Sequence, residues 1–275
     1  MSLIGIFDID YYLIHLCKLK TIINLTRTNK YFYELIKNMS FYKHLMKINE
    51  CKNKKLVIFK YGYLDVIKIL CNSKKFKYER DHIDLAAEFG HINILKFVKK
   101  LGYKFICLGN KYIGGTIDRA GKRGQIHILD WFKNSDLQIK YTNYSINWAS
   151  GSGHINILNW FKNSGLNFKY SKDAIRSASE SGHIHVLDWF KNSNYKFKYG
   201  ACAVDWASNN GHIHILEWFK NSEMEFKYSL NAINNASSEG HICVLEWFKN
   251  STYEFRYDNN AIDNAARNGH TNILN

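Results

Sequence analysis

Apolar residues recur along most of the chain with the spacing of short amphipathic helices. In the segment HIHVLDWFKN, the residues Ile184, Leu187 and Phe190 lie three positions apart. Val186 and Trp189 widen the same side. This spacing predicts a helix with a broad apolar face that is buried against other elements.

A second, shorter helix is predicted in the segment ACAVDWAS, where Val204 and Ala207 lie three positions apart. Gly211 follows the last periodic residue, a common position for glycine at the end of a helix. The stretch NSNYKFKYG connects the longer helix to this shorter one. Each unit therefore consists of a short helix, a tight Gly-His turn, a longer helix and a loop.

The unit is repeated at a fixed interval. From Gly124 to Gly269, five consecutive intervals of 29 residues separate the turn glycines, and the two earlier intervals are 28 and 34 residues. The longer interval holds five extra residues between Phe105 and Gly124, around ICLGNKYIGG. The glycines are Gly62, Gly90, Gly124, Gly153, Gly182, Gly211, Gly240 and Gly269. One helix pair cannot bury its apolar face alone, so this period predicts an all-α solenoid of stacked units.

The motif A-x-x-G-H-I-x-I-L-x-W-F resembles the ankyrin repeat. Ala86-Ala87 and Ala265-Ala266 reproduce the paired alanines of that family, and elsewhere the pair is Ala-Ser. The histidines after the turn glycine are His91, His154, His183, His212, His241 and His270. The Thr-Pro-Leu-His opening is missing, and the unit is about four residues shorter than an ankyrin repeat. The resemblance implies about eight ankyrin-like repeats over residues 52–275, with shortened hairpin fingers and an incomplete last repeat.

The repeats also resemble the ankyrin-repeat families expanded in large DNA viruses of amoebae. The W-F-K-N-S form, the absence of proline and the abundance of residues with AT-rich codons are the shared features. This resemblance implies a host protein as the partner, and a location in the cytoplasm or nucleus of the host cell. We expect the chain to be a monomer.

Residues 1–51 do not follow the repeat, and their segments FDIDYYLIHL and TIINLTRTNKYFYELI predict two or three short helices. The order of aliphatic and aromatic residues resembles a degenerate F-box, although the Leu-Pro of that family is absent. The resemblance implies that a Skp-type adaptor of a ubiquitin ligase binds this segment. The residues of the binding face would be Ile14, Leu16, Ile22, Leu25, Tyr31, Phe32 and Leu35. The other interpretation is a helical cap over the first repeat, because the end units of a stack need a shielded face.

The chain is basic, with 38 Lys and Arg against 24 Asp and Glu, a net charge of +14. Two sets of cations recur once in each unit. The outer-helix lysines are Lys133, Lys162, Lys191, Lys220 and Lys249, and the loop cations are Lys140, Lys169, Lys198, Lys227 and Arg256. Stacking would place each set in a line, so binding of nucleic acid or an acidic partner is the alternative function. The other interpretation is a solvated surface whose basic character follows codon usage.

Several classes of function are not indicated. The chain has no apolar run of 18 residues, so no membrane span is predicted, and its six cysteines are scattered, which favours reduced thiols. No GxSxG, GxxxxGK[ST] or HExxH motif occurs. Residues such as His183 and His185, two positions apart on a helix, point in different directions, so we expect the turn histidines to hydrogen-bond neighbouring backbone. We predict no enzyme activity, no cofactor and no metal site, and we expect the repeated Trp-Phe pairs to form core.

The repeat copies within the chain can be compared with one another. Counting back from each turn glycine, the seventh and fourth residues are apolar or small, as in Ile146 and Ala149, while the sixth, fifth, second and first residues vary. Constant positions are expected to hold the stack, and variable positions on the short helices are expected to line the concave face of an ankyrin-like fold. The candidate partner-binding residues are Asn147, Trp148, Arg176, Glu180, Asp205, Trp206, Asn209, Asn234, Asn235 and Glu239. Trp148 and Trp206 are the candidate anchors, because aromatic residues dominate binding hot spots.

The leading hypothesis is therefore a scaffold that binds a target protein on its concave face and acts as a substrate adaptor of a ubiquitin ligase. The other interpretation of the variable positions is neutral variation on an unused surface.

Overall fold

The computed structural model describes residues 54–72, 79–105, 115–137 and 139–274. The predicted N-terminal segment 1–51 and most of the five-residue insertion lie outside these ranges, so both interpretations of that segment stay predictions. The described residues form helices joined by turns and loops, and no strand occurs among them. They fall into two compact units.

The first unit contains α5 (Lys54–Lys60), α6 (Leu64–Asn72) and most of α7 (Arg80–Glu88) and α8 (Ile92–Lys100). Its apolar side chains are buried as the repeat pattern predicts, with Phe59, Ile67 and Ile83 fully enclosed. The Phe59 ring packs against the ring of His82 at a centroid distance of 5.1 Å.

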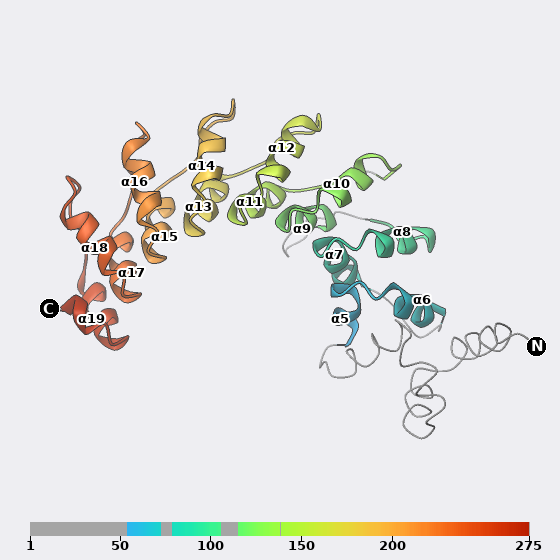
Figure 1. Ribbon diagram of the computed structural model, residues 1–275, viewed down its shortest axis with the longest axis horizontal. Helices are drawn as coiled ribbons and strands as arrows, with labels where there is room; N and C mark the ends of the chain where they lie inside the picture. The colour runs from blue at the N-terminus through green and yellow to red at the C-terminus, as the bar shows by residue number, and fades with distance from the viewer. Residues whose placement is uncertain (1–53, 73–78, 106–114, 138, 275) are drawn as a thin grey trace, which may run out of the picture. The chain divides into compact units, whose positions relative to one another are not determined.

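The second unit contains residues 87–92 and 103–275, and six helix pairs lie within its described part. The short helices, called inner helices below, are α9 (Thr116–Lys122), α11 (Tyr144–Gly151), α13 (Lys172–Glu180), α15 (Cys202–Asn209), α17 (Asn231–Ser238) and α19 (Asn259–Arg267). The outer helices are α10 (Ile126–Lys133), α12 (Ile155–Asn163), α14 (Ile184–Lys191), α16 (Ile213–Asn221), α18 (Ile242–Lys249) and α20 (Thr271–Leu274). The two sets form two rows, and neighbouring inner helices pack far more closely than neighbouring outer helices (Figure 1).

Small side chains allow this close packing of the inner row. Ala178 and Ala207 are fully buried in the inner helices, and a Cβ added to Gly121 would lie only 3.0 Å from the backbone oxygen of Ser145 on the next helix. The outer helices fill the space behind them with large side chains such as Leu187 and Phe190, which are also fully buried. The pattern of apolar positions therefore identifies the core correctly.

The Asn-Ser pair after each Trp-Phe-Lys ends the outer helix. In α14 the Ser193 hydroxyl donates to the Phe190 carbonyl at 2.8 Å and accepts the backbone N–H of Tyr195 at 3.2 Å. Local side-chain bonds of this kind compete with the helical pattern and favour a turn. The same pair of bonds recurs at Ser135, Ser164, Ser222 and Ser251.

Aromatic packing orders the loops in the place of a hairpin finger. Phe168 stacks on Tyr195 of the next loop at 4.1 Å and on Trp189 at 5.5 Å. The Tyr199 hydroxyl donates to the carbonyl of Glu225, one repeat further along, at 2.6 Å. The loops of adjacent repeats are thus held together without a strand, in agreement with the predicted shortened fingers.

The Gly-His turn connects successive repeats through the histidine ring. Gly182 has a φ of +75°, a conformation that glycine adopts without strain. The ring of His212 covers it, since a Cβ at Gly182 would lie 3.2 Å from the His212 Cε1 atom. The His212 Nε2 atom is 3.1 Å from the Glu180 carbonyl oxygen, and the His214 Nε2 atom is 3.0 Å from the carbonyl oxygen of Gly182. The prediction that a turn histidine hydrogen-bonds neighbouring backbone is confirmed at His212.

The turn histidines His154, His183 and His212 make the stability of the fold sensitive to acid. Burial lowers the pKa of His154, His183 and His212, and neighbouring positive charge acts in the same direction. A histidine whose pKa is lower in the folded than in the unfolded chain stabilises the fold fully above its unfolded value of about 6.5, and that stability is lost as the pH falls below it. We expect the urea midpoint of unfolding, followed by circular dichroism, to decrease steadily from pH 7.5 to pH 5.

The variant H154N/H183N/H212N is the control for this prediction. It is expected to be less stable at pH 7.5, but its urea midpoint should change less between pH 7.5 and pH 5. A wild-type midpoint that stays constant or rises with acid contradicts the prediction.

Candidate functional site

The candidate partner-binding residues all lie on or directly after the inner helices of the second unit. They divide into three groups by burial. Asn147, Asp205 and Asn234 are buried, whereas Trp206 and Glu239 are exposed. Trp148, Arg176, Glu180, Asn209 and Asn235 are partly exposed.

The buried group holds each repeat to the next one. The Asn147 side chain accepts the backbone N–H of Ser171 at 3.1 Å and donates to the Ser171 hydroxyl at 2.8 Å. Asp205 accepts the backbone N–H and the hydroxyl of Ser229 at 2.8 and 2.7 Å. The partner residue is always 24 positions further along, where the next inner helix begins, and we call this paired contact the bracket.

The bracket recurs in two further repeats. Asn234 donates to Asp258 at 2.8 Å and accepts its backbone N–H at 3.2 Å. Asp118, which is fully buried, accepts the backbone N–H and the hydroxyl of Thr142, both at 2.9 Å. The interpretation of this position as free surface is therefore corrected for Asn147, Asp205 and Asn234. Their identity varies because Asn and Asp make the same contact.

The bracket is replaced at one junction of the described stack. Arg176 occupies the bracket position of α13, and the residue 24 positions further along is Gly200, which has no side chain to receive the contact. The Arg176 guanidinium instead pairs with Glu180 at 2.8 Å and with Asp173 at 3.4 Å on its own helix. The α13–α15 junction thus lacks the contact that stabilises its neighbours, and a charged side chain lies at the surface there.

Restoring the bracket should stabilise the protein. We expect the double variant R176N/G200S to raise the free energy of unfolding by about 1–2 kcal/mol, since it adds two hydrogen bonds and reduces the flexibility of the unfolded chain. A Cβ at Gly200 meets no atom within 4 Å, so the serine fits. Urea denaturation of the double variant and of both single variants measures the coupling. If the change in unfolding free energy of the double variant equals the sum of the two single changes, residues 176 and 200 do not interact and the bracket prediction is contradicted.

The exposed and partly exposed groups include two tryptophans on nearby inner helices. The Trp206 side chain is 38% exposed on α15. On α11, the Trp148 ring stacks on the ring of Tyr144 at 5.0 Å, and Tyr144 is 40% exposed. Other residues of these helices fill the core, so the exposed aromatic side chains are available to a partner.

Four contributors to this surface were not identified from the sequence. Tyr144 extends the surface formed by Trp148. The other three are Arg119 and Lys122 on α9 and Arg123 directly after it, and all three contact Glu88 at the end of α7. The three cations lie at the end of the 34-residue interval, before the run of regular 29-residue intervals begins. The sequence feature that could have identified them is the presence of basic residues at three variable positions, the fifth, second and first before Gly124.

The two lines of cations lie mostly against aromatic rings. The outer-helix lysines lie 5.7 to 6.0 Å above the indole of the next repeat, as Lys133 over Trp160, Lys162 over Trp189, Lys191 over Trp218 and Lys220 over Trp247. The loop cations lie over tyrosines of the preceding loop, as Lys169 over Tyr141, Lys198 over Tyr170, Lys227 over Tyr199 and Arg256 over Tyr228. Cation–π contacts of this kind give these residues a role in joining repeats.

The repeated tryptophans also bind the preceding repeat through their ring N–H groups. The donors and acceptors are Trp160 to Asp130, Trp189 to Asn159, Trp218 to Asp188 and Trp247 to Glu217. These rings are therefore part of the scaffold, as expected for the Trp-Phe pairs, although each is half-buried.

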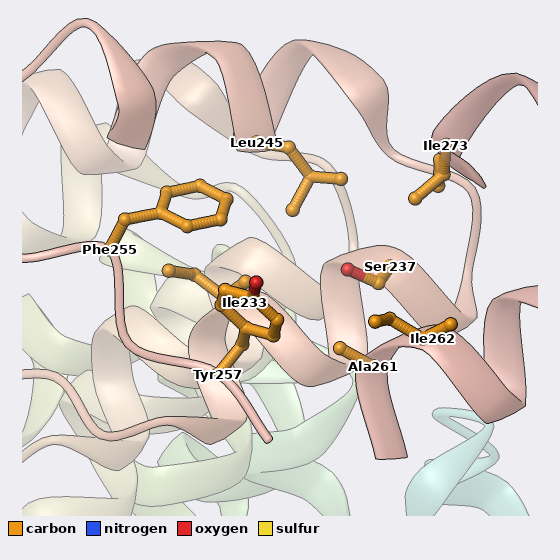
Figure 2. Close-up of a pocket in the computed structure, with 8 residues that line it drawn as sticks. All are labelled: Ile233, Ser237, Leu245, Phe255, Tyr257, Ala261, Ile262 and Ile273. Carbon is orange, nitrogen blue, oxygen red and sulfur yellow. The ribbon is translucent and has the colours of Figure 1, made fainter. Parts of the chain in front are cut away.

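A pocket of about 250 Å³ lies at the end of the second unit (Figure 2). Phe255, Tyr257 and Ile262 line it and are exposed. One repeat earlier, the residues equivalent to Phe255 and Tyr257 are covered by the following repeat, where Phe226 stacks on Trp247 at 5.6 Å. The pocket thus lies on an apolar face equivalent to the one that the following repeat covers in earlier repeats, and it lacks the converging polar groups of a small-molecule site.

The described residues show no cluster of three His, Cys, Asp or Glu side chains that could hold a metal ion. None of the helices in the described ranges is long and apolar enough to cross a membrane.

A solved structure with a similar fold is the crystal structure of the human ASB11 ankyrin repeat domain. It is 14% identical to this chain, with a TM-score of 0.50, and the match covers 70% of this chain and 96% of that chain. The all-α, ankyrin-like repeat fold predicted from the sequence is confirmed. Models of known protein families and curated protein sequences give no match to the chain.

Proposed function

We propose that the chain is a non-enzymatic scaffold that binds a target protein on the inner helices α11, α13 and α15. The observation that supports this most strongly is the exposure of Trp206 and of the Tyr144–Trp148 stack on this row. Arg176 lies on the helix between them, at a bracket position where ion pairs on the same helix replace the contact to the next repeat. Trp, Tyr and Arg are the residues most enriched among binding hot spots.

The row of inner helices is also suited to binding because residues other than Trp148 and Trp206 hold it together. The core is filled by the apolar positions, and the brackets hold the repeats together from buried positions. Substitutions at Trp148 or Trp206 should therefore change binding without unfolding the chain.

The test is affinity capture from host-cell extract with the full chain, followed by mass spectrometry. We expect the variants W148A and W206A to lose most of the captured target, since truncation of a hot-spot aromatic costs at least about 2 kcal/mol, or roughly thirtyfold in affinity. The control is E246A, which changes an exposed residue on the outer helix α18. Capture that W148A and W206A leave unchanged contradicts the proposal, as does an equal loss in E246A.

We further propose that the target is a host protein in the cytoplasm or nucleus, and that residues 1–51 deliver it to a ubiquitin ligase through a Skp-type adaptor. The support is the F-box-like order of aliphatic and aromatic residues in that segment. A pull-down with a purified Skp-type adaptor tests this part alone, with the chain lacking residues 1–51 as control. Absence of binding at micromolar concentrations refutes the adaptor role and leaves the protein-binding proposal intact.

The alternative function is binding of nucleic acid or of an acidic partner through the outer-helix lysines and loop cations. Their position over Trp and Tyr rings explains their regular spacing without a polyanion. A salt titration of binding to generic DNA and RNA distinguishes the two functions. Weak binding that disappears with added salt and shows no sequence preference indicates charge alone.

A further inference from the structure

We propose that the surface formed by α9 and α11 binds an acidic segment of the target protein that carries an apolar side chain beside its carboxylates. This inference rests on the proposed protein-binding function and names the chemistry of the partner. The surface consists of Arg119, Lys122, Arg123, Tyr144 and Trp148, and we call it the basic–aromatic patch.

The patch has an excess of positive charge. Glu88, which is only 4% exposed, is bound by Arg119 Nη1 at 3.1 Å, Lys122 Nζ at 3.3 Å and Arg123 Nε at 3.5 Å. Burial acts to raise the pKa of Glu88, but Lys122 and Arg119 outweigh it and hold that pKa below its ordinary value. Glu88 is therefore ionised at neutral pH and neutralises one of the three cations, so the cluster keeps a charge of about +2.

Two of the three cations can accept a further carboxylate. The Arg123 side chain is 51% exposed and the Lys122 side chain 44%. Arg123 contacts Glu88 through Nε alone, and among the described residues its two Nη groups make no hydrogen bond. Its guanidinium carbon lies 4.7 Å from the centre of the Phe89 ring. A planar guanidinium whose two Nη groups make no hydrogen bond within the described residues can bind the two oxygens of a carboxylate.

An apolar binding surface adjoins these cations directly. Lys122 Nζ lies 5.7 Å above the Trp148 ring, and Trp148 stacks in turn on the exposed ring of Tyr144. A residue next to the bound carboxylate in a peptide would reach this aromatic pair. The patch therefore combines a charge anchor with an apolar anchor, which together favour a mixed acidic and apolar segment over a purely charged one.

The limited extent of the charge favours a peptide over a nucleic acid. On α13, the inner helix that follows the patch, the residues equivalent to Arg119, Lys122 and Arg123 are Ser177, Glu180 and Ser181. The three cationic positions of α9 therefore do not recur on α13 and do not form a continuous track along the row. A nucleic-acid backbone gains its affinity from many successive phosphate contacts, which this patch does not offer.

The test uses a fluorescein-labelled peptide that alternates glutamate with leucine and phenylalanine, and a second peptide with glutamine in place of each glutamate. Fluorescence anisotropy with the full chain at about 0.15 M salt should show at least tenfold tighter binding of the acidic peptide. The double variant K122Q/R123Q, which leaves Arg119 on Glu88, should lose this tenfold preference. W148A should weaken binding of both peptides.

The matched control is R267Q, which removes a cation from the same repeat position as Lys122 but on α19. R267Q should bind the acidic peptide within twofold of wild type, and circular dichroism should show that all variants are folded. Equal binding of the two peptides, or an equal loss in R267Q, overturns the proposal. So does a single-stranded oligothymidylate that binds more tightly than the acidic peptide and displaces it.

Failure here can be distinguished from failure of the proposed function. If K122Q/R123Q still captures the host target at wild-type strength while W206A does not, the patch inference is refuted and the scaffold function stands. If neither W148A nor W206A changes capture, the scaffold function itself is refuted.

Discussion

Replacing Phe190 by alanine is expected to lower the free energy of unfolding by about 3–5 kcal/mol. Phe190 is fully buried in α14, where its ring contacts Tyr170 of the preceding loop at 5.3 Å and Trp189 at 5.1 Å. Removing the ring leaves a cavity in a closely packed stack. It also exposes Tyr170, whose hydroxyl donates to the carbonyl of Lys196 in the next loop. Urea denaturation followed by circular dichroism measures the loss.

The damage should be local, because each repeat contacts only its neighbours. Amide hydrogen exchange in the F190A variant is expected to accelerate most in α13 to α16 and least in α9 and α10. The control is N194A, an exposed loop substitution that should change stability by no more than about 0.5 kcal/mol. A loss below about 1 kcal/mol in F190A, or exchange that accelerates equally in all repeats, contradicts the prediction.

Replacing Asp205 by alanine is expected to cost about 2–4 kcal/mol, whereas asparagine should keep stability within about 1 kcal/mol of wild type at pH 7. Alanine leaves the backbone N–H and the hydroxyl of Ser229 without their acceptor. The Asp205 position is only 6% exposed, so water does not readily replace the lost carboxylate. Asparagine already makes the same contact at Asn147.

The pH dependence adds a second test of this bracket. Burial raises the pKa of Asp205, and the hydrogen bonds from Ser229 oppose the shift without cancelling it. An acid with a raised folded pKa stabilises the fold most below its unfolded value of about 3.9, and this contribution is lost as the pH rises through the folded pKa. D205N should therefore gain stability relative to wild type when the pH rises from 4 to 7. Equal costs for D205A and D205N at pH 7 would show that the bracket does not act through hydrogen bonding.

The fold was predictable because the core positions are constant in kind. Residues such as Ile146 and Ala149 recur at fixed distances from the turn glycine, and apolar residues at those positions have one physical role. The shortened fingers followed from the length of the unit. The partners of the cations could not be deduced, since a 29-residue period places Lys162 in a line of lysines but does not show that it lies over Trp189.

The candidate surface was only partly predictable, because variation in identity does not always mean freedom from contacts. Asn147 and Asp205 differ in charge, yet both accept the same backbone N–H from the next repeat. The signal that separates them from Trp148 and Trp206 is a second residue, a Ser, Thr or Asp 24 positions further along. Comparing single positions between copies does not reveal a correlation between two positions.

The bracket also determines how this chain can be cut and recombined. Its two halves belong to successive repeats, so a module excised at the Gly182 turn takes Arg176 with it but leaves Gly200 behind. Grafted next to a unit that begins with serine, Arg176 would meet a partner to which it cannot offer an acceptor oxygen. Transplantation or duplication of whole units should therefore treat residues 176–200 as inseparable, and place its junctions at other turns where Asn or Asp faces Ser, Thr or Asp.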